Sequence, residues 1–313
     1  MGFKDFAKAA AVNIGRIGDA VMFRHTLFSL PFAVMALLIE TRGQPPLRTI
    51  ILIVLAAAAG RNAANALNRV IDAEIDARNP RTAGRHLPSG TLSKKTLLVF
   101  SGIMGIILVV SAALLNPLCV ILLPLAAVLI GGYSYSKRFT WLCHYWLGVA
   151  CACAPMGSFI AVSGRFEFRY FVLAGAHALW VAGFDILYAL QDIGFDRKEH
   201  IKSIPARFGP GPARFLAILS HLGTLAGLAA LPLFWDLSWF YLGGVAAGAV
   251  LLISEHIIAL GNSERHIRIA SYSINEILPL VVLLGTILDI YVPVPGRLDV
   301  HQFIGNSLDF LRR

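Results

Sequence analysis

Three oxygen-bearing side chains recur at every fourth position in one stretch of the chain, at Asn68, Asp72 and Asp76. On a helix this spacing places them along one face, about one turn apart. Two carboxylates placed in this way repel each other unless a cation lies between them. A hard divalent ion such as Mg²⁺ suits the position, because it takes oxygen ligands and is usually held by one or two carboxylates together with substrate phosphates. The stretch therefore predicts a Mg²⁺–phosphate site.

A basic loop follows this acidic stretch, with Arg78, Arg81 and Arg85 in quick succession. Because guanidinium groups bind phosphate oxygens in pairs, we expect these bases to meet the phosphate charge that the metal does not neutralise. Glu74 shares the helix but lies two residues from each aspartate. It therefore points to another face, and we leave it out of the expected metal site.

A second acidic cluster repeats the pattern farther along the chain. Asp185, Tyr188 and Asp192 share a helix face at positions i, i+3 and i+7, and Asp196 follows Asp192 by four residues. Ionisable residues at membrane depth are costly and usually functional. Two acidic patches, each followed by bases, suit a diphosphate carried on an apolar chain. Because metal and bases would stabilise the departing diphosphate, the allylic carbon of an isoprenoid diphosphate could ionise without a protein nucleophile.

A third segment carries aromatic and basic residues together, from Tyr133 to Trp141, with Lys137 and Arg138 in the middle. Aromatic faces stabilise positive charge, and Lys137 or Arg138 could pair with the carboxylate of an acceptor molecule. The same composition is also typical of an aromatic belt at a membrane surface, flanked by topology-setting bases. On composition alone the two interpretations are evenly balanced.

The composition requires a membrane environment for these clusters. The chain has 313 residues, 57% hydrophobic and 14% charged, with a mean hydropathy of +0.70. Several apolar runs reach the roughly 20 residues of a spanning helix, and they are continuous, which excludes a β-barrel. We predict an all-α, polytopic bundle of about nine transmembrane helices. The expected spans are approximately 25–41, 47–70, 96–115, 117–134, 141–163, 170–191, 212–233, 237–260 and 269–292.

The loops between these spans carry their bases unevenly. The side opposite the N-terminus holds only a minority of the Lys and Arg residues, namely Arg42, Arg48, Arg165, Arg169, Arg297, Arg312 and Arg313. The positive-inside rule then places the N-terminus and both acidic clusters on the cytoplasmic side of a plasma (inner) membrane. The net charge of +9 is confined to short loops. We attribute it to topology and anionic lipid, and expect no nucleic-acid partner.

The remaining features predict structure and not chemistry. Residues 1–24 are read as an amphipathic interfacial segment, 25–292 as the transmembrane domain and 293–313 as a polar tail. The histidines within the expected spans (His144, His177, His221, His256) lack the spacing of metal ligands and are read as hydrogen-bonded packing residues. Glu255, Glu276 and Asp289 should face the bundle, and the four cysteines, which form no CxxC pair, should pack as small apolar residues.

Together these motifs resemble the UbiA-type intramembrane aromatic prenyltransferases. The resemblance rests on Asn68-xxx-Asp72-xxx-Asp76 with its basic loop, the Tyr-Ser-Tyr-Ser-Lys-Arg-Phe-Thr segment, and Asp185-xx-Tyr188-xxx-Asp192-xxx-Asp196. It covers nearly the whole chain from near Arg24. It implies a nine-helix bundle around a central cavity and a Mg²⁺-dependent transfer of a polyprenyl group from polyprenyl diphosphate. The implied acceptor is an aromatic acid, 4-hydroxybenzoate or a dihydroxynaphthoate, of ubiquinone or menaquinone biosynthesis.

The resemblance also implies a role for each matching residue. Asn68, Asp72 and Asp76 correspond to the first metal–diphosphate motif, and Asp192 and Asp196 to the second. Asp185, with Tyr188 beside it, corresponds to an acid near the reacting carbon. The implied substrate contacts are Arg81, Arg85 and Lys202 for the diphosphate, and Arg138 for the acceptor carboxylate.

Two departures from the family pattern leave the number of metal ions open. Arg69 follows Asn68 where many relatives carry Asn-Asp, and Ile193-Gly194-Phe195 stands where relatives often have further acids. Two alternative functions also remain. A secondary transporter for an anionic substrate would likewise place polar residues within apolar helices. An enzyme of the same class could instead act on a glycerol phospholipid or a haem.

Overall fold

The computed structural model describes residues 15–22, 26–261, 266–267 and 269–293, and this part of the chain is helical throughout its regular elements. Eight stretches are long and apolar enough to cross a membrane. They are built on α3 (Leu47–Ile71), α5 (Lys94–Leu115), α6 (Pro117–Ser136), α7 (Cys143–Ser163), α8 (Tyr170–Ala189), α11 (Pro210–Ala230), α12 (Trp239–Ala259) and α14 (Asn275–Tyr291). The all-α membrane bundle expected from hydropathy is confirmed.

The remaining expected span, 25–41, corresponds to the shorter helix α2 (Thr26–Glu40), whose apolar part is Phe28–Glu40. Its side chains Phe32, Met35 and Ala36 are completely buried. They belong to the main core, which also contains Trp180 and Tyr241. Because α2 is enclosed by protein, its length does not have to match the thickness of the bilayer.

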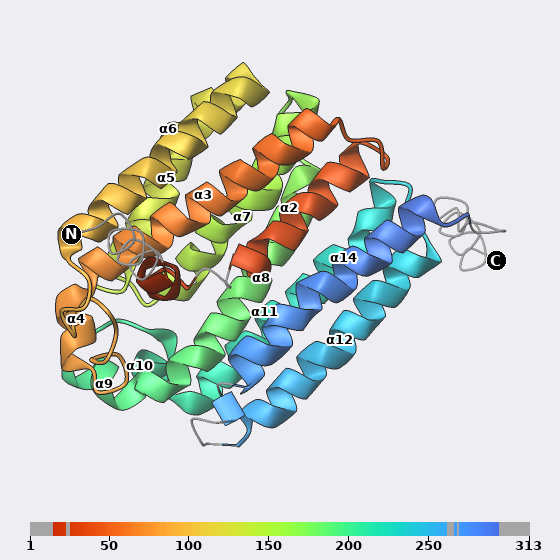
Figure 1. The fold of residues 1–313 in the computed structure, drawn as a ribbon. Coiled ribbons are helices and arrows are strands. Elements are labelled where there is room, and N and C mark those ends of the chain that lie inside the picture. Colours follow the sequence, from red (N-terminus) through yellow and green to blue (C-terminus); the bar gives the residue numbers. More distant parts are fainter. Residues whose placement is uncertain (1–14, 23–25, 262–265, 268, 294–313) are drawn as a thin grey trace.

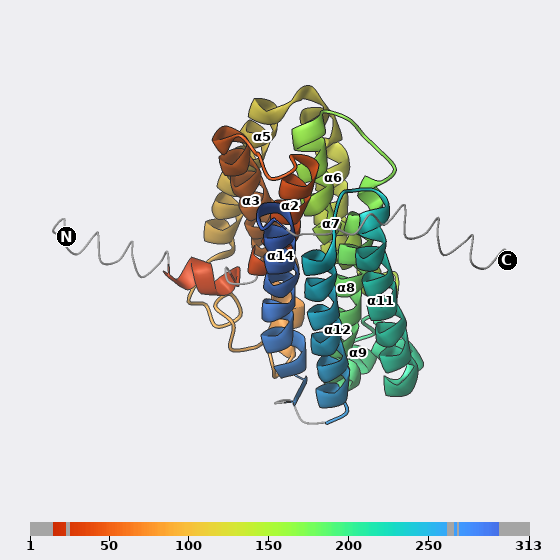
Figure 2. The same ribbon diagram turned by 90° about the vertical axis from the view of Figure 1, so that its right-hand side faces the viewer.

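The long helices run roughly alongside one another, as Figures 1 and 2 show. Their ends are set by local signals in the sequence. Asn116 caps α6 by accepting a hydrogen bond from the amide of Cys119, and Pro117 occupies the first helical turn. Gly164 ends α7 in the left-handed conformation, with φ 64°. Gly148 lets α7 approach α8 closely, since a Cβ atom there would lie 2.2 Å from the carbonyl oxygen of Ala178.

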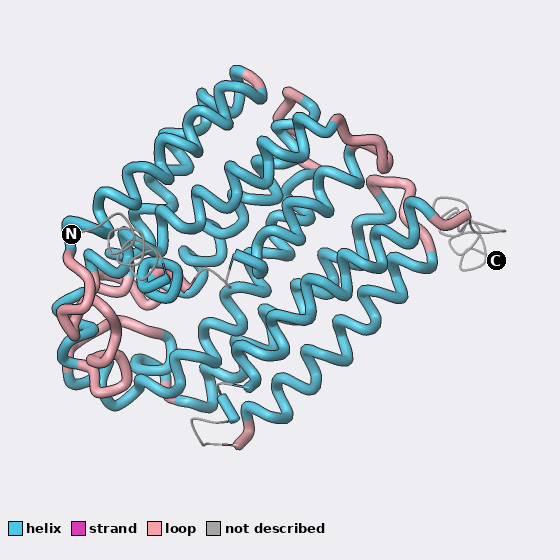
Figure 3. Tube along the Cα trace, in the orientation of Figure 1, coloured by secondary structure: helices cyan, strands magenta, loops and turns pink. Residues whose placement is uncertain are grey.

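Short helices gather at one end of the bundle, at the lower left of Figure 1. They are α4 (Ala73–Arg78), the 3₁₀ turn η2 (Leu190–Asp192), α9 (Ile193–Lys198) and α10 (Ile204–Phe208). The turn η2 continues directly from α8, and α4 follows α3 after Asp72, whereas loops join α4 to α5 and α9 to α10 (Figure 3). The backbone amide of Lys202 donates to the carbonyl oxygen of Lys137 over 2.8 Å. This contact fastens the loop before α10 to the turn between α6 and α7.

Glu40 organises a polar cluster where α2 ends. Its Oε1 accepts hydrogen bonds from Arg169 Nη2 at 2.9 Å and from the Tyr170 hydroxyl at 3.1 Å, and its Oε2 accepts from Trp235 Nε1 at 2.9 Å. Arg169 also lies over the Tyr170 and Trp235 rings. Burial acts to lower the pKa of Arg169, but Glu40, the Tyr170 hydroxyl and Glu167 outweigh it and raise that pKa. The cluster joins α2, the start of α8 and the segment before α12.

Two of the acids that were expected to face the bundle, Glu255 and Asp289, are buried in it. Glu255 is fully buried and accepts from Asn275 Nδ2 at 2.8 Å, while Asp289 accepts from the amides of Ser238 and Tyr241. His221 and His256 contact each other at 2.9 Å. The four cysteines are free. The two expected terminal segments lie mostly outside the described residues: of 1–24 only 15–22 are described, and of 293–313 only residue 293.

Candidate active site

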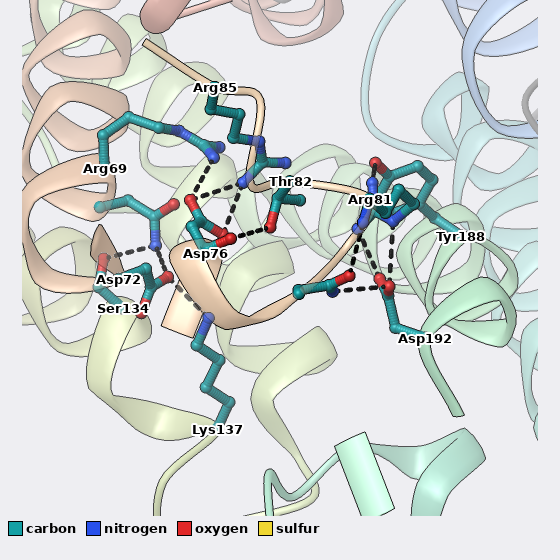
Figure 4. A network of polar contacts seen from close by, with 12 residues as sticks. Arg69, Asp72, Asp76, Arg81, Thr82, Arg85, Ser134, Lys137, Tyr188 and Asp192 are labelled. Carbon is teal, nitrogen blue, oxygen red and sulfur yellow. Dashed lines mark hydrogen bonds and ion pairs between the residues drawn. The ribbon is translucent and has the colours of Figure 1, made fainter. Parts of the chain in front are cut away.

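A polar cavity of about 280 Å³ opens at the end of the bundle where the short helices gather. Both acidic motifs line it, although more than a hundred residues separate them in the chain. Ten of the site residues expected from the sequence contribute to its wall: Asn68, Asp72, Asp76, Arg81, Arg85, Lys137, Asp185, Tyr188, Asp192 and Asp196. Figure 4 shows most of their polar contacts from close by.

The first motif crosses a break between α3 and α4. Helix α3 ends at Ile71, and Asp72 has φ −92° and ψ 2°. The helical hydrogen-bond pattern nevertheless continues, because the amide of Asp72 donates to Asn68 O and that of Asp76 donates to Asp72 O, at 2.9 and 2.8 Å. Asn68 Nδ2 also donates to Asp72 Oδ2 at 2.8 Å. The three residues therefore share a face despite the break. Glu74 is 88% exposed and faces elsewhere, as expected.

Basic side chains of the protein neutralise both carboxylates of the first motif. Lys137 Nζ lies 2.7 Å from Asp72 Oδ2. Arg85 and Arg69 donate to Asp76, at 2.8 and 3.3 Å. Lysine and arginine side chains therefore contribute positive charge beside both aspartates, because the chain brings the end of α6 and the basic loop against the motif.

The second motif is joined to the first by Arg81. Its Nε and Nη2 donate to Asp192, at 3.0 and 2.5 Å, and its Nη1 bonds the hydroxyl of Tyr188, whose ring lies beneath the guanidinium. Asn79 Nδ2 also donates to Asp192, at 3.0 Å. Asp192 ends the η2 turn, so the basic loop after α4 is fastened directly to the end of the α8 helix.

The other two acids of the second cluster, Asp196 and Asp185, have different partners. Ser203, which caps α10, donates to Asp196 Oδ2 at 2.7 Å. Asp185 pairs with His144 on α7, with 2.7 Å between Oδ2 and Nδ1. Sequence reasoning overlooked Arg69, Asn79, Ser203 and His144. Only Asn79 and Ser203 carried a signal, since Asn and Ser next to an acidic motif commonly serve as caps and hydrogen-bond partners.

Two expected contact residues do not line the cavity. Arg138 is 38% exposed and donates to the carbonyl oxygens of Ser134 and Ile71, with its guanidinium 3.6 Å from Asp72. Lys202 Nζ donates to the carbonyl oxygen of Phe139 at 3.2 Å. Both bases therefore brace the α6–α7 turn in this structure. Lys137 is the member of the Lys-Arg pair that points into the site.

The expected metal ligands that line the cavity, Asn68 and the aspartates, offer amide and carboxylate oxygens, which suit a hard cation. The Oδ1 atom of Asp72 is buried and accepts no hydrogen bond among the described residues. Within that same part of the chain, His, Cys, Asp and Glu form no convergent group of three. The carboxylates instead stand singly or in pairs, as in sites where Mg²⁺ takes one or two carboxylates and completes its shell with substrate phosphates and water.

A second, apolar cavity of about 430 Å³ adjoins the polar one. It is formed by side chains of α3, α5, α6, α7 and α8. Four residues line both cavities: Arg61, Asn65, Tyr133 and Leu147. An elongated molecule with one charged end and one apolar end can therefore lie across the junction, with each part in a matching environment.

Comparison with known proteins identifies the family and the fold. The profile of the UbiA prenyltransferase family matches residues 29–275, which is most of the chain. The chain belongs to this family. It is a prenyltransferase, and the resemblance seen in its motifs is confirmed.

Curated relatives agree with this family membership. A 4-hydroxybenzoate octaprenyltransferase of Escherichia fergusonii is 30% identical over 80% of this chain and 86% of the relative. The protein of the same name from Vibrio vulnificus is 28% identical over 83% of this chain and 91% of the relative. These UbiA relatives are matched over nearly their whole length.

Solved structures of UbiA homologues have the same fold. The apo structure of a homologue from Aeropyrum pernix K1 superimposes with a TM-score of 0.78 at 32% identity, covering 85% of this chain and 98% of that one. A homologue from Archaeoglobus fulgidus bound to GPP and Mg²⁺ has a TM-score of 0.62 at 18% identity, covering 88% and 100%. At that identity the second structure establishes the shared fold alone.

Proposed function

We propose that this prenyltransferase transfers a polyprenyl group from polyprenyl diphosphate to an aromatic acid, either 4-hydroxybenzoate or a dihydroxynaphthoate. The observation that carries the proposal is the meeting of two acidic motifs and their bases in one polar cavity that adjoins an apolar one. The names of the curated relatives support 4-hydroxybenzoate as the first acceptor to test.

The diphosphate end of the substrate belongs in the polar cavity. Asp72 and Asp76 on one side, and Asp192 and Asp196 on the other, would hold Mg²⁺, with Asn68 as a neutral oxygen ligand. The metal supplies charge neutralisation of the leaving diphosphate. Arg81 and Arg85 already point to these acids, so they are placed to transfer hydrogen bonds to phosphate oxygens when the substrate enters. Tyr188, beside Arg81, adds an aromatic face near the developing positive charge.

The isoprenoid tail belongs in the apolar cavity. Its wall is built mainly from alanine, leucine and isoleucine side chains and has few polar atoms, so burying an isoprenoid chain there would remove apolar area from water. The 430 Å³ volume is comparable to that of ordinary ligand pockets.

The acceptor would bind at the junction of the two cavities. Asp185 lies on α8 seven residues before Asp192, roughly 10 Å deeper along the helix axis. Lys137 lines the polar cavity, and Arg61 lines both cavities with its Nε buried and without a hydrogen bond among the described residues. Either cation could bind the carboxylate of the acid. Arg138 and Lys202 do not line the cavity, so we assign them to holding the α6–α7 turn and not to binding substrate.

We place the enzyme in the plasma (inner) membrane of a bacterium, with the polar cavity open to the cytoplasm, in ubiquinone or menaquinone biosynthesis. The charge bias of the loops supports this orientation. The transporter alternative gains no support, because the acids gather at or near the ends of α3 and α8, on the side of the bundle where the short helices lie.

The deciding experiment is turnover by the purified full-length protein in nanodiscs. A polyprenyl diphosphate and Mg²⁺ are supplied with 4-hydroxybenzoate or with a dihydroxynaphthoate, and each reaction is repeated with EDTA. A prenylated product from one acceptor that disappears on chelation supports the proposal. If neither acceptor reacts while the diphosphate still binds in the presence of Mg²⁺, the acceptor assignment is wrong.

A further inference from the structure

His144 and Asp185 form a pair at the floor of the polar cavity. His144 Nδ1 lies 2.7 Å from Asp185 Oδ2. Both residues line the cavity, but the histidine side chain is 4% exposed whereas that of the aspartate is 26% exposed. The carboxylate is therefore the more accessible of the two from the space that a substrate would enter.

A second contact orients the ring of His144. The backbone amide of Ile204, at the start of α10, lies 3.4 Å from His144 Nε2. The ring is therefore held from both sides, with Nδ1 facing Asp185 and Nε2 facing the start of α10.

The partner of Asp185 differs in kind from those of Asp72, Asp76 and Asp192. Each of those three carboxylates forms an ion pair with Lys or Arg. Asp185 is instead held by an imidazole, through one contact at its Oδ2. The other oxygen of Asp185, Oδ1, accepts no hydrogen bond from the described residues.

We propose that His144 is a positioning residue for Asp185: it holds Oδ2 so that Oδ1 is presented to the aromatic acceptor. This inference rests on the proposed function, in which Asp185 works at the acceptor end of the site. In this role His144 acts through Asp185: its contribution is to keep one carboxylate in a fixed orientation toward the cavity.

One competing role for His144 comes from the same contacts. Helix α10 also carries Ser203, whose hydroxyl binds Asp196. His144 could therefore serve to anchor α10, and through Ser203 the second metal–diphosphate motif. The two roles affect opposite ends of the site. Loss of the Asp185 contact affects the acceptor step, whereas loosening of α10 weakens diphosphate binding.

The test compares His144→Leu and His144→Gln with the wild-type enzyme in nanodiscs. Three quantities are measured: kcat with saturating substrates, the Kd for polyprenyl diphosphate with Mg²⁺, and the midpoint of thermal unfolding. Leucine removes both hydrogen bonds, while the glutamine amide can donate to Asp185 and accept from Ile204. His177→Leu is the matched control, because His177 is a fully buried histidine whose ring nitrogens make no hydrogen bond among the described residues.

We expect His144→Leu to lower kcat about tenfold or more, the usual effect of losing a hydrogen bond to a charged group. The Kd for the diphosphate should stay unchanged, glutamine should restore most of kcat, and His177→Leu should retain it. Three results overturn the positioning role: unchanged kcat in the leucine variant, weaker diphosphate binding in that variant, or a folded glutamine variant as slow as the leucine one. Absence of turnover in the wild-type enzyme would instead overturn the proposed function, and this inference with it.

Discussion

Arg81 and Asp192 are joined by two hydrogen bonds, from Nε to Oδ1 at 3.0 Å and from Nη2 to Oδ2 at 2.5 Å. The two residues come from different acidic clusters, so this one pair ties the basic loop after α4 to the end of α8. Such a two-pronged contact requires the planar guanidinium and cannot be reproduced by lysine.

Replacing Arg81 by Lys should therefore reduce kcat/KM for polyprenyl diphosphate by about tenfold or more, even though the charge is kept. The matched control is Arg78→Lys. Arg78 lies in the same segment, but it is 58% exposed and pairs with Glu199 away from the cavity. Steady-state kinetics at varied diphosphate concentration measure both variants. Equal activity of R81K and wild type would contradict the assignment of Arg81 to the diphosphate.

Asp72→Asn should reduce turnover by about a hundredfold, on the order of the loss seen when a preorganised charge-stabilising group is removed. The substitution keeps the shape but removes the negative charge that faces Lys137. The control Glu74→Gln removes an acid from the same short segment at an 88% exposed position and should leave turnover unchanged. The titration of activity with Mg²⁺ should shift to higher concentration for D72N only. A normal Mg²⁺ dependence in D72N would remove Asp72 from the metal site.

Enlarging a side chain inside the apolar cavity should change which isoprenoid chain is accepted. Ala57 on α3 lines this cavity. Ala57→Phe should retain activity with a short prenyl diphosphate and lose most activity with a long one, since the phenyl ring occupies tail volume. Ala113→Phe makes the same change at an exposed position on α5 that does not line the cavity, and it should leave the preference intact. Product analysis by mass spectrometry with mixed donors checks both.

The Glu40 cluster should contribute to stability and not to chemistry. Glu40 is about one-tenth exposed and accepts hydrogen bonds from three residues of other segments. Glu40→Gln removes the charge opposite Arg169 and should lower the free energy of unfolding by about 1–3 kcal/mol. Glu167→Gln, which removes a more exposed partner of Arg169, should cost less. Thermal unfolding in detergent ranks the variants; a loss of kcat in the folded fraction of E40Q would show that the cluster affects the site.

The close approach of α7 and α8 offers a prediction about packing. Gly148→Ala should lower the midpoint of unfolding, because its methyl group would meet the carbonyl oxygen of Ala178 at 2.2 Å. Gly102→Ala places a methyl where nothing lies within 4 Å, so it should leave the midpoint unchanged or raise it. The thermal midpoints of the two purified variants provide the comparison.

Hydropathy and helical spacing were enough to predict most of the fold and the convergence of the two acidic motifs. Spans of apolar residues are marked directly by composition, and the four-residue steps of Asn68, Asp72 and Asp76 survive the break at Asp72. Neither signal reports which helices are neighbours. The His144–Asp185 pair joins residues 41 apart on α7 and α8, so it depends on packing that leaves no period in the sequence.

The same limit explains the misplaced bases. Lys137 and Arg138 are adjacent, and composition treats them alike. Their difference arises because Lys137, the C-cap residue that follows α6, pairs with Asp72, while Arg138 is turned back onto the carbonyl oxygens of Ser134 and Ile71. Arg69 was read as a departure from the family pattern. In the structure it is a partner of Asp76, and its role could be recognised only once the basic loop was seen folding back over α3.

The pairing of the acids with lysine and arginine also bears on how the chain is made. A newly synthesised membrane protein must enter the bilayer before it can collect its ligands, and bare carboxylates near the apolar region would resist insertion. Here Asp72, Asp76 and Asp192 each have a basic partner encoded in the same chain. The polar centre can therefore assemble in a nearly charge-balanced form during biogenesis.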